Sequence, residues 1–324
     1  MDSSTKAIET PELFSIKGLV AVISGGGSGI GRMITRALAV NGAAKVYILG
    51  RRGAVLEETA KPFPDVVIPI ECDVTSKESL QAAVDKVTKE VGYINVLWCN
   101  SGTSGPESPE LTSSSSLNQF IEANWRHSVE EYAETFKVNT AGFWYTAIAF
   151  LKLLHLGNER GNGMHRSQII GTCSTLGFGR FAATGRFAYG QSKASQTHMM
   201  KQLSTHLVPY GIRVNMVAPG HMTSSMTASG YDPSKLIPEG RAGADTDMAG
   251  IVLFLTRTGG NDQISRVGFV SGGSLAFNPL TNSRKLPGCL MLTNAMWTFF
   301  DCLKLASMMP RNLLFTSPRP VNMG

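Results

Sequence analysis

The sequence contains few cysteines and histidines, and neither type occurs in a pattern that indicates a metal site or a disulfide framework. The five cysteines show no C-x-x-C spacing and the six histidines form no ligand cluster, so we predict no metal ion. Three cysteines adjoin apolar runs, which is typical of buried thiols in a reducing compartment. Residues 1–13 form a polar leader without the apolar core of a secretory signal. These absences predict a cytoplasmic protein.

A strong basic charge is also missing from most of the chain. The net charge is +6, but residues 279–324 carry five basic residues and one acidic residue, which leaves +2 for everything before them. Domains that bind nucleic acid generally show a pronounced basic stripe or cluster. We therefore predict that nucleic acid is not a partner.

Short apolar runs alternate with helical patterns from about Ile16 to Phe277, and no linker or repeat interrupts them. This alternation predicts an α/β fold: a Rossmann-type, doubly wound parallel sheet with helices on both faces. We expect one domain at 14–278 and a separate tail at 279–324. The predicted strands are Leu19–Ser24, Lys45–Gly50, Val66–Ile70, Ile94–Trp98, Gln168–Thr172, Ile212–Val217 and Val267–Val270. The predicted helices include Ser76–Val91, His127–Leu156 and Met248–Thr256, whereas Ser104–Asn118 is predicted to be a loop.

A glycine-rich turn follows the first predicted strand and opens a helical pattern. Its spacing is G-x-x-x-G-x-G, formed by Gly25, Gly29 and Gly31, with Ser28 and Ile30 among them. Glycines at such a turn let the backbone approach a pyrophosphate, and the helix N-terminus supplies N–H donors and positive potential. The turn therefore predicts a dinucleotide site.

The end of the second predicted strand indicates which dinucleotide binds. Dinucleotide folds often place an acidic residue there to hold the ribose 2′-hydroxyl, but this chain has Gly50 followed by Arg51 and Arg52. A guanidinium binds a 2′-phosphate through two parallel hydrogen bonds, whereas a carboxylate repels it. We therefore predict NADP(H) as the cofactor.

Asp73 and Val74 follow the third predicted strand, at the same edge of the sheet, and both are predicted to contact the cofactor. Asp73 either accepts a hydrogen bond from the adenine amine or caps the helix that begins near Ser76. The sequence leaves these two roles open.

Tyr189 and Lys193 stand four residues apart in a segment with a helical pattern. Side chains at i and i+4 share one helix face, and a cation beside a phenol favours its ionised form. Such a phenol can exchange a proton with a substrate near neutral pH. Upstream, Ser174 and Thr175 offer hydroxyl groups to a substrate oxygen.

Together, these motifs resemble the short-chain dehydrogenase/reductase family over roughly Phe14 to Phe277. The run AYGQSKAS…LVPYGIRVNMVAPGHMTSSMT is most similar in appearance to 3-oxoacyl reductases of the rhamnolipid-biosynthesis type. The resemblance implies an NADPH-dependent oxidoreductase that reduces a ketone to a secondary alcohol, with Tyr189 as the proton donor. It also implies that Lys193 binds the ribose hydroxyls.

The resemblance assigns further site residues by position. It implies that Asn139 holds a water molecule against Lys193 and lies at the cofactor with Tyr189. Asn100 and Gly102 match the N-N-A-G segment of the family, while Gly220, Met222 and Ser224 match the P-G segment that closes on the nicotinamide.

The chain departs from the family at the substrate-binding serine. That serine usually lies thirteen residues before the tyrosine, and here the position is Leu176. Ser174 and Thr175 both remain candidates, because either hydroxyl can donate one hydrogen bond to a carbonyl. We favour Ser174, because its unbranched side chain reorients more freely than a β-branched one.

An alternative function is a non-catalytic, NADP-binding regulatory protein. For the enzyme, we predict a small carbonyl or alcohol substrate and, from the resemblance, a homodimer or homotetramer. The tail has an apolar centre at Cys289–Met309, which Asn294, Asp301 and Lys304 interrupt. Charged residues at a bilayer centre are costly, so we favour a tail that is packed or partly disordered over peripheral membrane contact, and both over a spanning helix.

Overall fold

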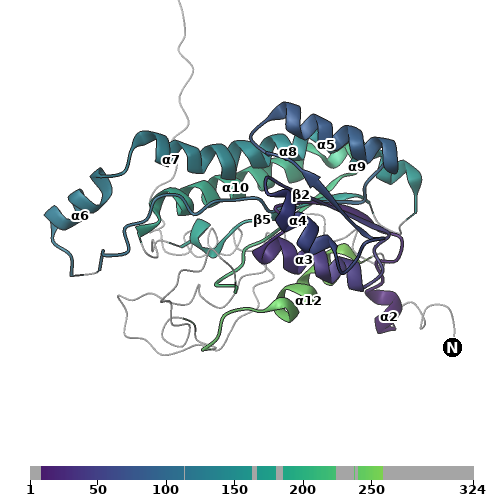
Figure 1. The fold of residues 1–324 in the computed structure, drawn as a ribbon, viewed down its shortest axis with the longest axis horizontal. Coiled ribbons are helices and arrows are strands. Elements are labelled where there is room, and N and C mark those ends of the chain that lie inside the picture. Colours follow the sequence, from purple (N-terminus) through teal and green to yellow (C-terminus); the bar gives the residue numbers. More distant parts are fainter. Residues whose placement is uncertain are drawn as a thin grey trace, which may run out of the picture. The chain divides into compact units, whose positions relative to one another are not determined.

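The computed structural model describes residues 9–112, 114–162, 166–179, 185–223, 237 and 240–257 (Figure 1). All of them belong to the larger of the two units into which the chain divides, Met1–Leu292. The last predicted strand, Val267–Val270, and the tail at 279–324 lie outside the described residues.

A parallel sheet of six strands forms the centre of the described part, in the order β3-β2-β1-β4-β5-β6. Every residue of β1, β4, β5 and β6 is buried, as expected for strands covered on both faces. The predicted fold class is confirmed, and these six strands begin and end within two residues of the prediction. Their bounds are β1 Val20–Ser24, β2 Lys45–Gly50, β3 Val67–Glu71, β4 Val96–Cys99, β5 Gln168–Thr172 and β6 Arg213–Val217.

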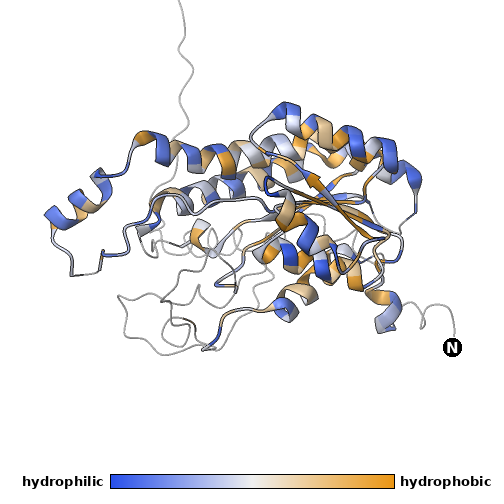
Figure 2. Cartoon of the chain, in the orientation of Figure 1, coloured by the Kyte–Doolittle hydropathy of each residue, from blue (hydrophilic) through white to orange (hydrophobic). Residues whose placement is uncertain are grey.

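Helices cover both faces of this sheet. On one face, α3 (Gly29–Val40), α4 (Gly53–Ala60) and α12 (Asp245–Thr256) contribute to one apolar cluster. On the other face, a second cluster includes side chains of α5 (Lys77–Glu90), α8 (Phe143–Ala149), α9 (Leu151–Arg160) and α10 (Phe187–His206). Figure 2 shows the hydrophobic strands between helices whose outer faces are hydrophilic. The two apolar clusters cover both faces of the sheet and so hold its strands, whose carboxyl ends form the candidate site, in position.

The predicted helix His127–Leu156 is interrupted in the structure. It consists of α7 (Val129–Phe136), the π-helical segment η1 (Lys137–Gly142), α8 and α9. A π-helical turn widens the helix and often lies at a functional site. The helical prediction is therefore confirmed for most of this stretch, and side-chain periodicity does not reveal the extra residue in the π-helical turn.

Helix α6 (Leu117–Trp125) was not predicted, and it begins at the end of the predicted loop. Its N-cap Ser116 accepts a hydrogen bond from the Gln119 N–H, and the Gln119 side chain accepts one from the Ser116 N–H. This reciprocal capping box is visible in the sequence and predicts a helix start. Its apolar side chains include Leu117 and Trp125, both largely exposed.

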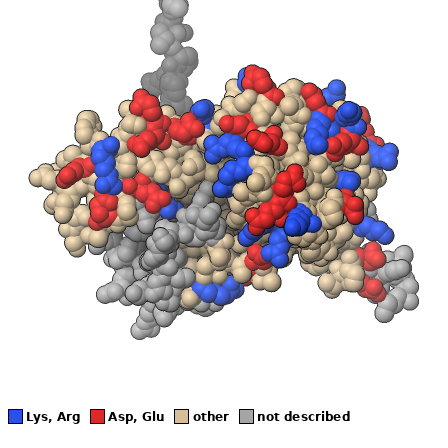
Figure 3. All heavy atoms as spheres, in the orientation of Figure 1, with Lys and Arg blue, Asp and Glu red and all other residues tan. Residues whose placement is uncertain are grey.

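Short elements complete the described chain: α2 (Thr10–Leu13) and the 3₁₀ turns η2 (Thr175–Gly177) and η4 (Val208–Tyr210). None of the helices in the described part combines the length and the hydropathy that a bilayer crossing requires. On the face seen in Figure 3, lysine and arginine are interspersed with aspartate and glutamate. That face shows no basic stripe, and the absence of a nucleic-acid partner stays a prediction.

Candidate active site

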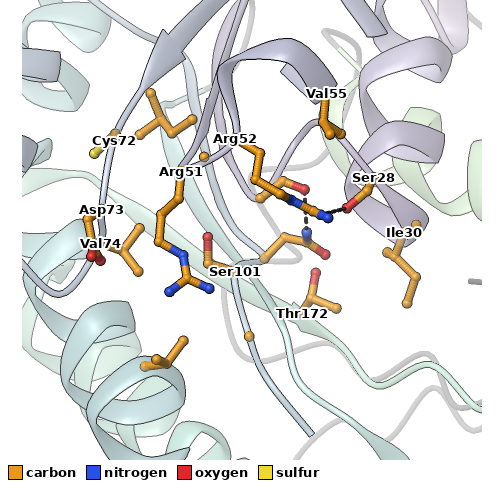
Figure 4. A pocket seen from close by; sticks show the side chains of 18 of the residues that line it. Ser28, Ile30, Arg51, Arg52, Val55, Cys72, Asp73, Val74, Ser101 and Thr172 are labelled. Atoms are coloured by element: carbon orange, nitrogen blue, oxygen red, sulfur yellow. Dashed lines mark hydrogen bonds between the residues drawn. The ribbon is translucent and has the colours of Figure 1, made fainter. Parts of the chain in front are cut away.

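A cleft of about 240 Å³ lies at the carboxyl ends of the parallel strands. Ligands of doubly wound folds bind at this edge, because the loops that follow the strands converge there. Figure 4 shows side chains from the ends of several strands around the cleft. Fourteen of the predicted site residues line it: Gly25, Ser28, Gly29, Ile30, Arg51, Arg52, Asp73, Val74, Asn100, Gly102, Ser174, Tyr189, Lys193 and Gly220.

The backbone of the glycine turn packs so closely on itself that a side chain does not fit at Gly31. Gly25 has a φ of 67°, a region that L-residues with a side chain rarely adopt. A Cβ on Gly31 would lie 1.9 Å from the carbonyl oxygen of Gly25, so only glycine fits there. Gly31 therefore shapes the turn from behind and does not line the cleft.

The turn is also anchored to the neighbouring strand. The Asn100 amide donates to the Gly25 carbonyl at 3.2 Å, and the Ser24 hydroxyl accepts from the Asn100 N–H at 3.0 Å. Helix α3 begins at Gly29, with no side-chain cap from Ser28. The first N–H groups of a helix lack intrahelical acceptors, so this helix start can bind an anionic group in the cleft.

Two arginines follow β2 at the cleft. Figure 4 shows both side chains extending beyond the end of the strand, with the Arg52 guanidinium directed at the Ser28 hydroxyl. The Arg52 Nη2 atom lies 3.4 Å from Ser28 Oγ. Among the described residues, Arg51 forms no hydrogen bond or ion pair, so its five N–H donors are available to a phosphate.

Asp73 does not cap helix α5. The cap is Ser76, whose hydroxyl accepts from the Ser79 N–H. Asp73 instead accepts from the Thr75 N–H at 2.9 Å and from the Thr75 hydroxyl at 2.8 Å. The hydrogen bond from the Thr75 N–H lowers the pKa of the Asp73 carboxyl, and the positive charge of Arg51 adds to the effect. Because both of these bonds use Oδ1, the second carboxylate oxygen can accept from a ligand in the cleft.

The Tyr189 and Lys193 side chains lie together in helix α10. The Lys193 Nζ atom is 5.6 Å from the centre of the Tyr189 ring. Two acceptors hold the buried ammonium: the Thr172 carbonyl and the Gln196 Oε1 atom, each at 2.9 Å. Within the described part of the chain, the Tyr189 hydroxyl has no hydrogen-bond partner, so it can bond a ligand that enters the cleft.

Ser174 and Thr175 differ in their position relative to the cleft. Ser174 lines it, and its Oγ atom accepts from the Leu176 N–H at 3.2 Å, which leaves the O–H free to donate to a substrate. Thr175 is as buried as Ser174 but does not line the cleft, and its backbone N–H donates to the Pro219 carbonyl at 3.3 Å. The geometry therefore favours Ser174.

Asn139 lies behind the cleft and does not line it. Its side chain is fully buried and bonds both backbone groups of Thr103, at 2.8 and 2.9 Å, and the Ser192 hydroxyl at 2.9 Å. The backbone carbonyl of Asn139 accepts a hydrogen bond from the Gln196 side chain. Asn139 thus connects to Lys193 through Gln196, and the water molecule that the resemblance implies stays a prediction.

The segment after β6 is described in part. Gly220 lines the cleft, whereas Met222 is buried in the apolar cluster that includes α12 and pairs with Gly243 through a parallel bridge. The Met222 side chain therefore packs in the core, and Met222 is not among the residues that line the cleft. Ser224 lies outside the described residues.

Two cysteines line the cleft, but neither is suited to act as a nucleophile. Burial raises the pKa of the Cys72 thiol, and burial raises the pKa of the Cys173 thiol to about 11. Both therefore stay protonated near neutral pH, and a protonated thiol is a poor nucleophile. The described residues contain no cluster of potential metal ligands.

Sequence reasoning missed two groups that contact Lys193: the Thr172 carbonyl and the Gln196 amide. A backbone carbonyl carries no sequence signal. Gln196 does carry one, since it lies three residues after Lys193 on the same helix face.

A doubly wound parallel sheet with a dinucleotide cleft and a paired tyrosine and lysine defines an NAD(P)-binding oxidoreductase. The sequence profile described as "short chain dehydrogenase" matches residues 19–234. The chain belongs to this family, the short-chain dehydrogenases/reductases.

Relatives of known sequence agree with this assignment. The chain is 41% identical to "Short-chain dehydrogenase/reductase PhomF" of Diaporthe leptostromiformis, over 86% of this chain and 98% of that protein. It is 38% identical to "Short-chain dehydrogenase/reductase VdtF" of Byssochlamys spectabilis, over 85% and 98%. It is also 29% identical to "3-oxoacyl-[acyl-carrier-protein] reductase FabG" of Aquifex aeolicus, over 74% and 90%.

Solved structures show the same fold. A short-chain type dehydrogenase/reductase from Mycobacterium marinum superposes with a TM-score of 0.66 at 26% identity, over 83% of this chain and 100% of that chain. The Pseudomonas aeruginosa "RhlG/NADP active-site complex" superposes with a TM-score of 0.68 at 25% identity, over 80% and 97%.

Proposed function

We propose that the protein is an NADPH-dependent reductase that converts the ketone group of a small molecule into a secondary alcohol. The observation that carries this proposal is the placement of Tyr189 and Lys193 in the same cleft as the glycine turn. The Lys193 Nζ atom lies 5.6 Å from the centre of the Tyr189 ring. An acid beside a dinucleotide site is the arrangement that carbonyl reduction requires, because the developing alkoxide needs a proton.

The cleft fits a dinucleotide with a 2′-phosphate. The glycine turn has no space for a Cβ at Gly31, and the uncapped start of helix α3 offers free N–H groups for the pyrophosphate. Gly50 takes the place where a carboxylate would hold an unphosphorylated ribose, and Arg51 and Arg52 follow it at the cleft. Asp73 keeps one carboxylate oxygen available for the adenine amine. NADPH, when bound, supplies the hydride.

The residues of the chain then have distinct roles. Tyr189 donates its hydroxyl proton to the carbonyl oxygen as negative charge develops there. Ser174 donates a hydrogen bond to the same oxygen, which its free O–H permits. Lys193 holds its positive charge beside the phenol and favours its ionised form after the proton has left.

The named activities of relatives support the direction of this reaction. One relative is called a 3-oxoacyl-[acyl-carrier-protein] reductase, and another, from Candida albicans, is called "Sorbose reductase SOU1", with 26% identity over 78% of this chain. Both names describe reduction of a carbonyl group. The similar Pseudomonas aeruginosa structure is a complex with NADP, in keeping with the two arginines here.

The buried, free thiols of Cys72, Cys99 and Cys173 support a further proposal, that the protein works in the reducing cytoplasm.

The test is turnover by the purified full-length chain. NADPH consumption is measured with a 3-oxoacyl thioester and a panel of simple and aromatic ketones, and NADH is used in parallel. We expect turnover of at least one ketone with NADPH. Binding of NADPH without turnover of any carbonyl or alcohol would favour the regulatory alternative.

A further inference from the structure

Gln196 lies one helical turn after Lys193 in α10, and its side chain is fully buried. Its Oε1 atom accepts a hydrogen bond from Lys193 Nζ at 2.9 Å, and its Nε2 atom donates to the Asn139 carbonyl. One side-chain amide therefore connects the active-site lysine to the π-helical segment η1. Gln196 does not line the cleft, so it cannot touch substrate or cofactor.

The two partners determine the orientation of this amide. An ammonium group can only donate hydrogen bonds and a backbone carbonyl can only accept them. The Gln196 oxygen must therefore face Lys193, and the nitrogen must face Asn139. Leucine or methionine would fill a similar volume but would remove the hydrogen bond that each partner makes to Gln196, which is costly at a buried position.

The hydrogen-bond count of Lys193 shows what Gln196 contributes. An ammonium has three donors, and the Thr172 carbonyl and Gln196 Oε1 take two of them. The third N–H of Lys193 remains available, and Lys193 lines the cleft beside Tyr189. With both acceptors in place, the ammonium has a fixed position relative to the phenol.

The π-helical turn leaves the Asn139 backbone carbonyl available to accept from Gln196. In a regular α-helix the Phe143 N–H would bond the Asn139 carbonyl, but here it bonds the Thr140 carbonyl. The Asn139 carbonyl is thereby released from that α-helical bond and accepts from Gln196. The interruption of the helix and the position of Gln196 are thus two parts of one arrangement.

We propose that Gln196 is a positioning residue for the proposed reduction: it holds the Lys193 ammonium beside Tyr189 and ties helix α10 to η1. The inference rests on the proposed function for its catalytic consequence. Its structural part, the fixed state of the Lys193 ammonium, can be tested without turnover.

The experiment compares four full-length proteins. Gln196→Leu keeps the approximate volume and removes both hydrogen bonds, whereas Gln196→Glu keeps an acceptor toward Lys193. Gln202→Leu is the matched control, because Gln202 is exposed on the same helix. Wild type is the reference, and thermal unfolding shows that each protein is folded.

The first measurement is the rate at which acetic anhydride labels Lys193, followed by peptide mass spectrometry. Only the neutral amine reacts, so an acceptor that stabilises the ammonium slows the reaction. We expect labelling at least about threefold faster in Gln196→Leu than in wild type, and slower labelling in Gln196→Glu. The control should match wild type. Equal labelling rates in all four proteins would overturn the proposal. If Gln196→Leu does not fold, a labelling rate in Gln196→Glu equal to that of wild type would overturn it.

The second measurement is steady-state ketone reduction. We expect Gln196→Leu to lower kcat by about tenfold to a hundredfold, the loss expected from one hydrogen bond to a charged group. KM for the ketone should change by less than about threefold, because Gln196 does not touch the cleft. Gln196→Glu should retain more activity than Gln196→Leu. The reverse order would indicate a packing role, since a buried carboxylate packs less favourably than leucine.

The two measurements separate the two proposals. If wild type turns over no carbonyl compound, the proposed function fails, and the labelling order still decides the role of Gln196. If wild type is active and Gln196→Leu keeps both its kcat and its labelling rate, the role of Gln196 is disproved and the proposed function stands.

Discussion

The Lys193 ammonium lies 5.6 Å from the centre of the Tyr189 ring, and both groups line the cleft at the carboxyl edge of the sheet. Helix α10 sets this relationship, because residues four apart share one face of a helix. The lysine is held from behind by a strand carbonyl and by a second side chain of the same helix. The lysine is therefore held by the fold before any ligand enters.

Replacement of Tyr189 by phenylalanine should remove the proton donor with little change in the cleft. We expect the kcat for ketone reduction to fall by about 10²–10⁴, the usual contribution of a positioned acid. The NADPH dissociation constant should stay within about threefold, as measured by the fluorescence of the bound cofactor. Tyr210→Phe is the control, because Tyr210 is exposed in η4. Full activity in Tyr189→Phe would contradict the proposed mechanism.

Removal of both arginines after β2 should change the choice of cofactor. In Arg51→Ala/Arg52→Ala, we expect NADPH to bind at least about 100-fold more weakly, because two charge-assisted contacts to a phosphate are lost. NADH, which has no 2′-phosphate, should lose less than about threefold. Arg160→Ala/Lys89→Ala serves as a control for the loss of two positive charges, since these exposed residues lie in the last turns of α9 and α5. Equal losses for both cofactors would rule out the assignment of a 2′-phosphate site.

A methyl group at Gly31 should disrupt the glycine turn. Its Cβ would lie 1.9 Å from the Gly25 carbonyl oxygen, so the backbone must move. We expect Gly31→Ala to lower the free energy of unfolding by about 1–3 kcal/mol and to weaken NADPH binding. The control is Gly250→Ala in α12, where no atom lies within 4 Å of the added Cβ. That change should raise stability by up to about 1 kcal/mol.

The sequence predicted the parts of this site that depend on local pattern. The strands were found because runs such as Leu19–Ser24 are apolar throughout, which two covered faces require. The glycine turn was found because glycines with G-x-x-x-G-x-G spacing stand between an apolar run and a helical pattern. These signals are local, and each is present in a few consecutive residues.

The remaining features of the site depend on contacts between distant segments. The interruption of the predicted helix His127–Leu156 accompanies a bond between the Asn139 carbonyl and Gln196, which lie 57 positions apart. Periodicity along one helix does not contain that information. Met222 was assigned to the cleft from its place after Gly220, but its apolar side chain packs into the core with α12. Helix α6 was not predicted, although the sequence contains its capping box, Ser116 and Gln119.

The Asp73 carboxylate should make stability depend on acidic pH. Its pKa lies below the ordinary value of 3.8, chiefly because the Thr75 N–H donates to the ionised form. A group whose pKa is lowered by folding stabilises the protein above its unfolded pKa, and this contribution is lost as pH falls through the lower, folded pKa. We therefore expect the stability difference between wild type and Asp73→Asn to be constant from about pH 8 to pH 5.

That difference should shrink below about pH 3.8 as the carboxylate becomes protonated. Urea unfolding of both proteins at a series of pH values measures it. A difference that grows toward acidic pH would mean that Asp73 has the opposite shift. Asp85→Asn on the outer face of α5 provides the control for a change in net charge.

Helix α8 presents three large apolar side chains that are partly exposed. Trp144, Tyr145 and Ile148 are 38%, 40% and 39% exposed and lie within two turns of this helix. Large apolar groups gathered on one exposed surface often mark an interface. We predict a homodimer or homotetramer at micromolar concentration, with this surface of α8 in the interface. Light scattering coupled to size-exclusion chromatography measures the mass.

A charge in this surface should then weaken the assembly. Ile148→Glu would bury an unpaired carboxylate in the interface, which is costly, so we expect its mass to shift toward that of the monomer. Val208→Glu is the matched control, because Val208 is 66% exposed and belongs to a different element, η4. A monomeric wild type would disprove the assembly. An assembled Ile148→Glu protein would place the interface on another surface, because a carboxylate at the predicted contact could not stay unpaired without loss of affinity.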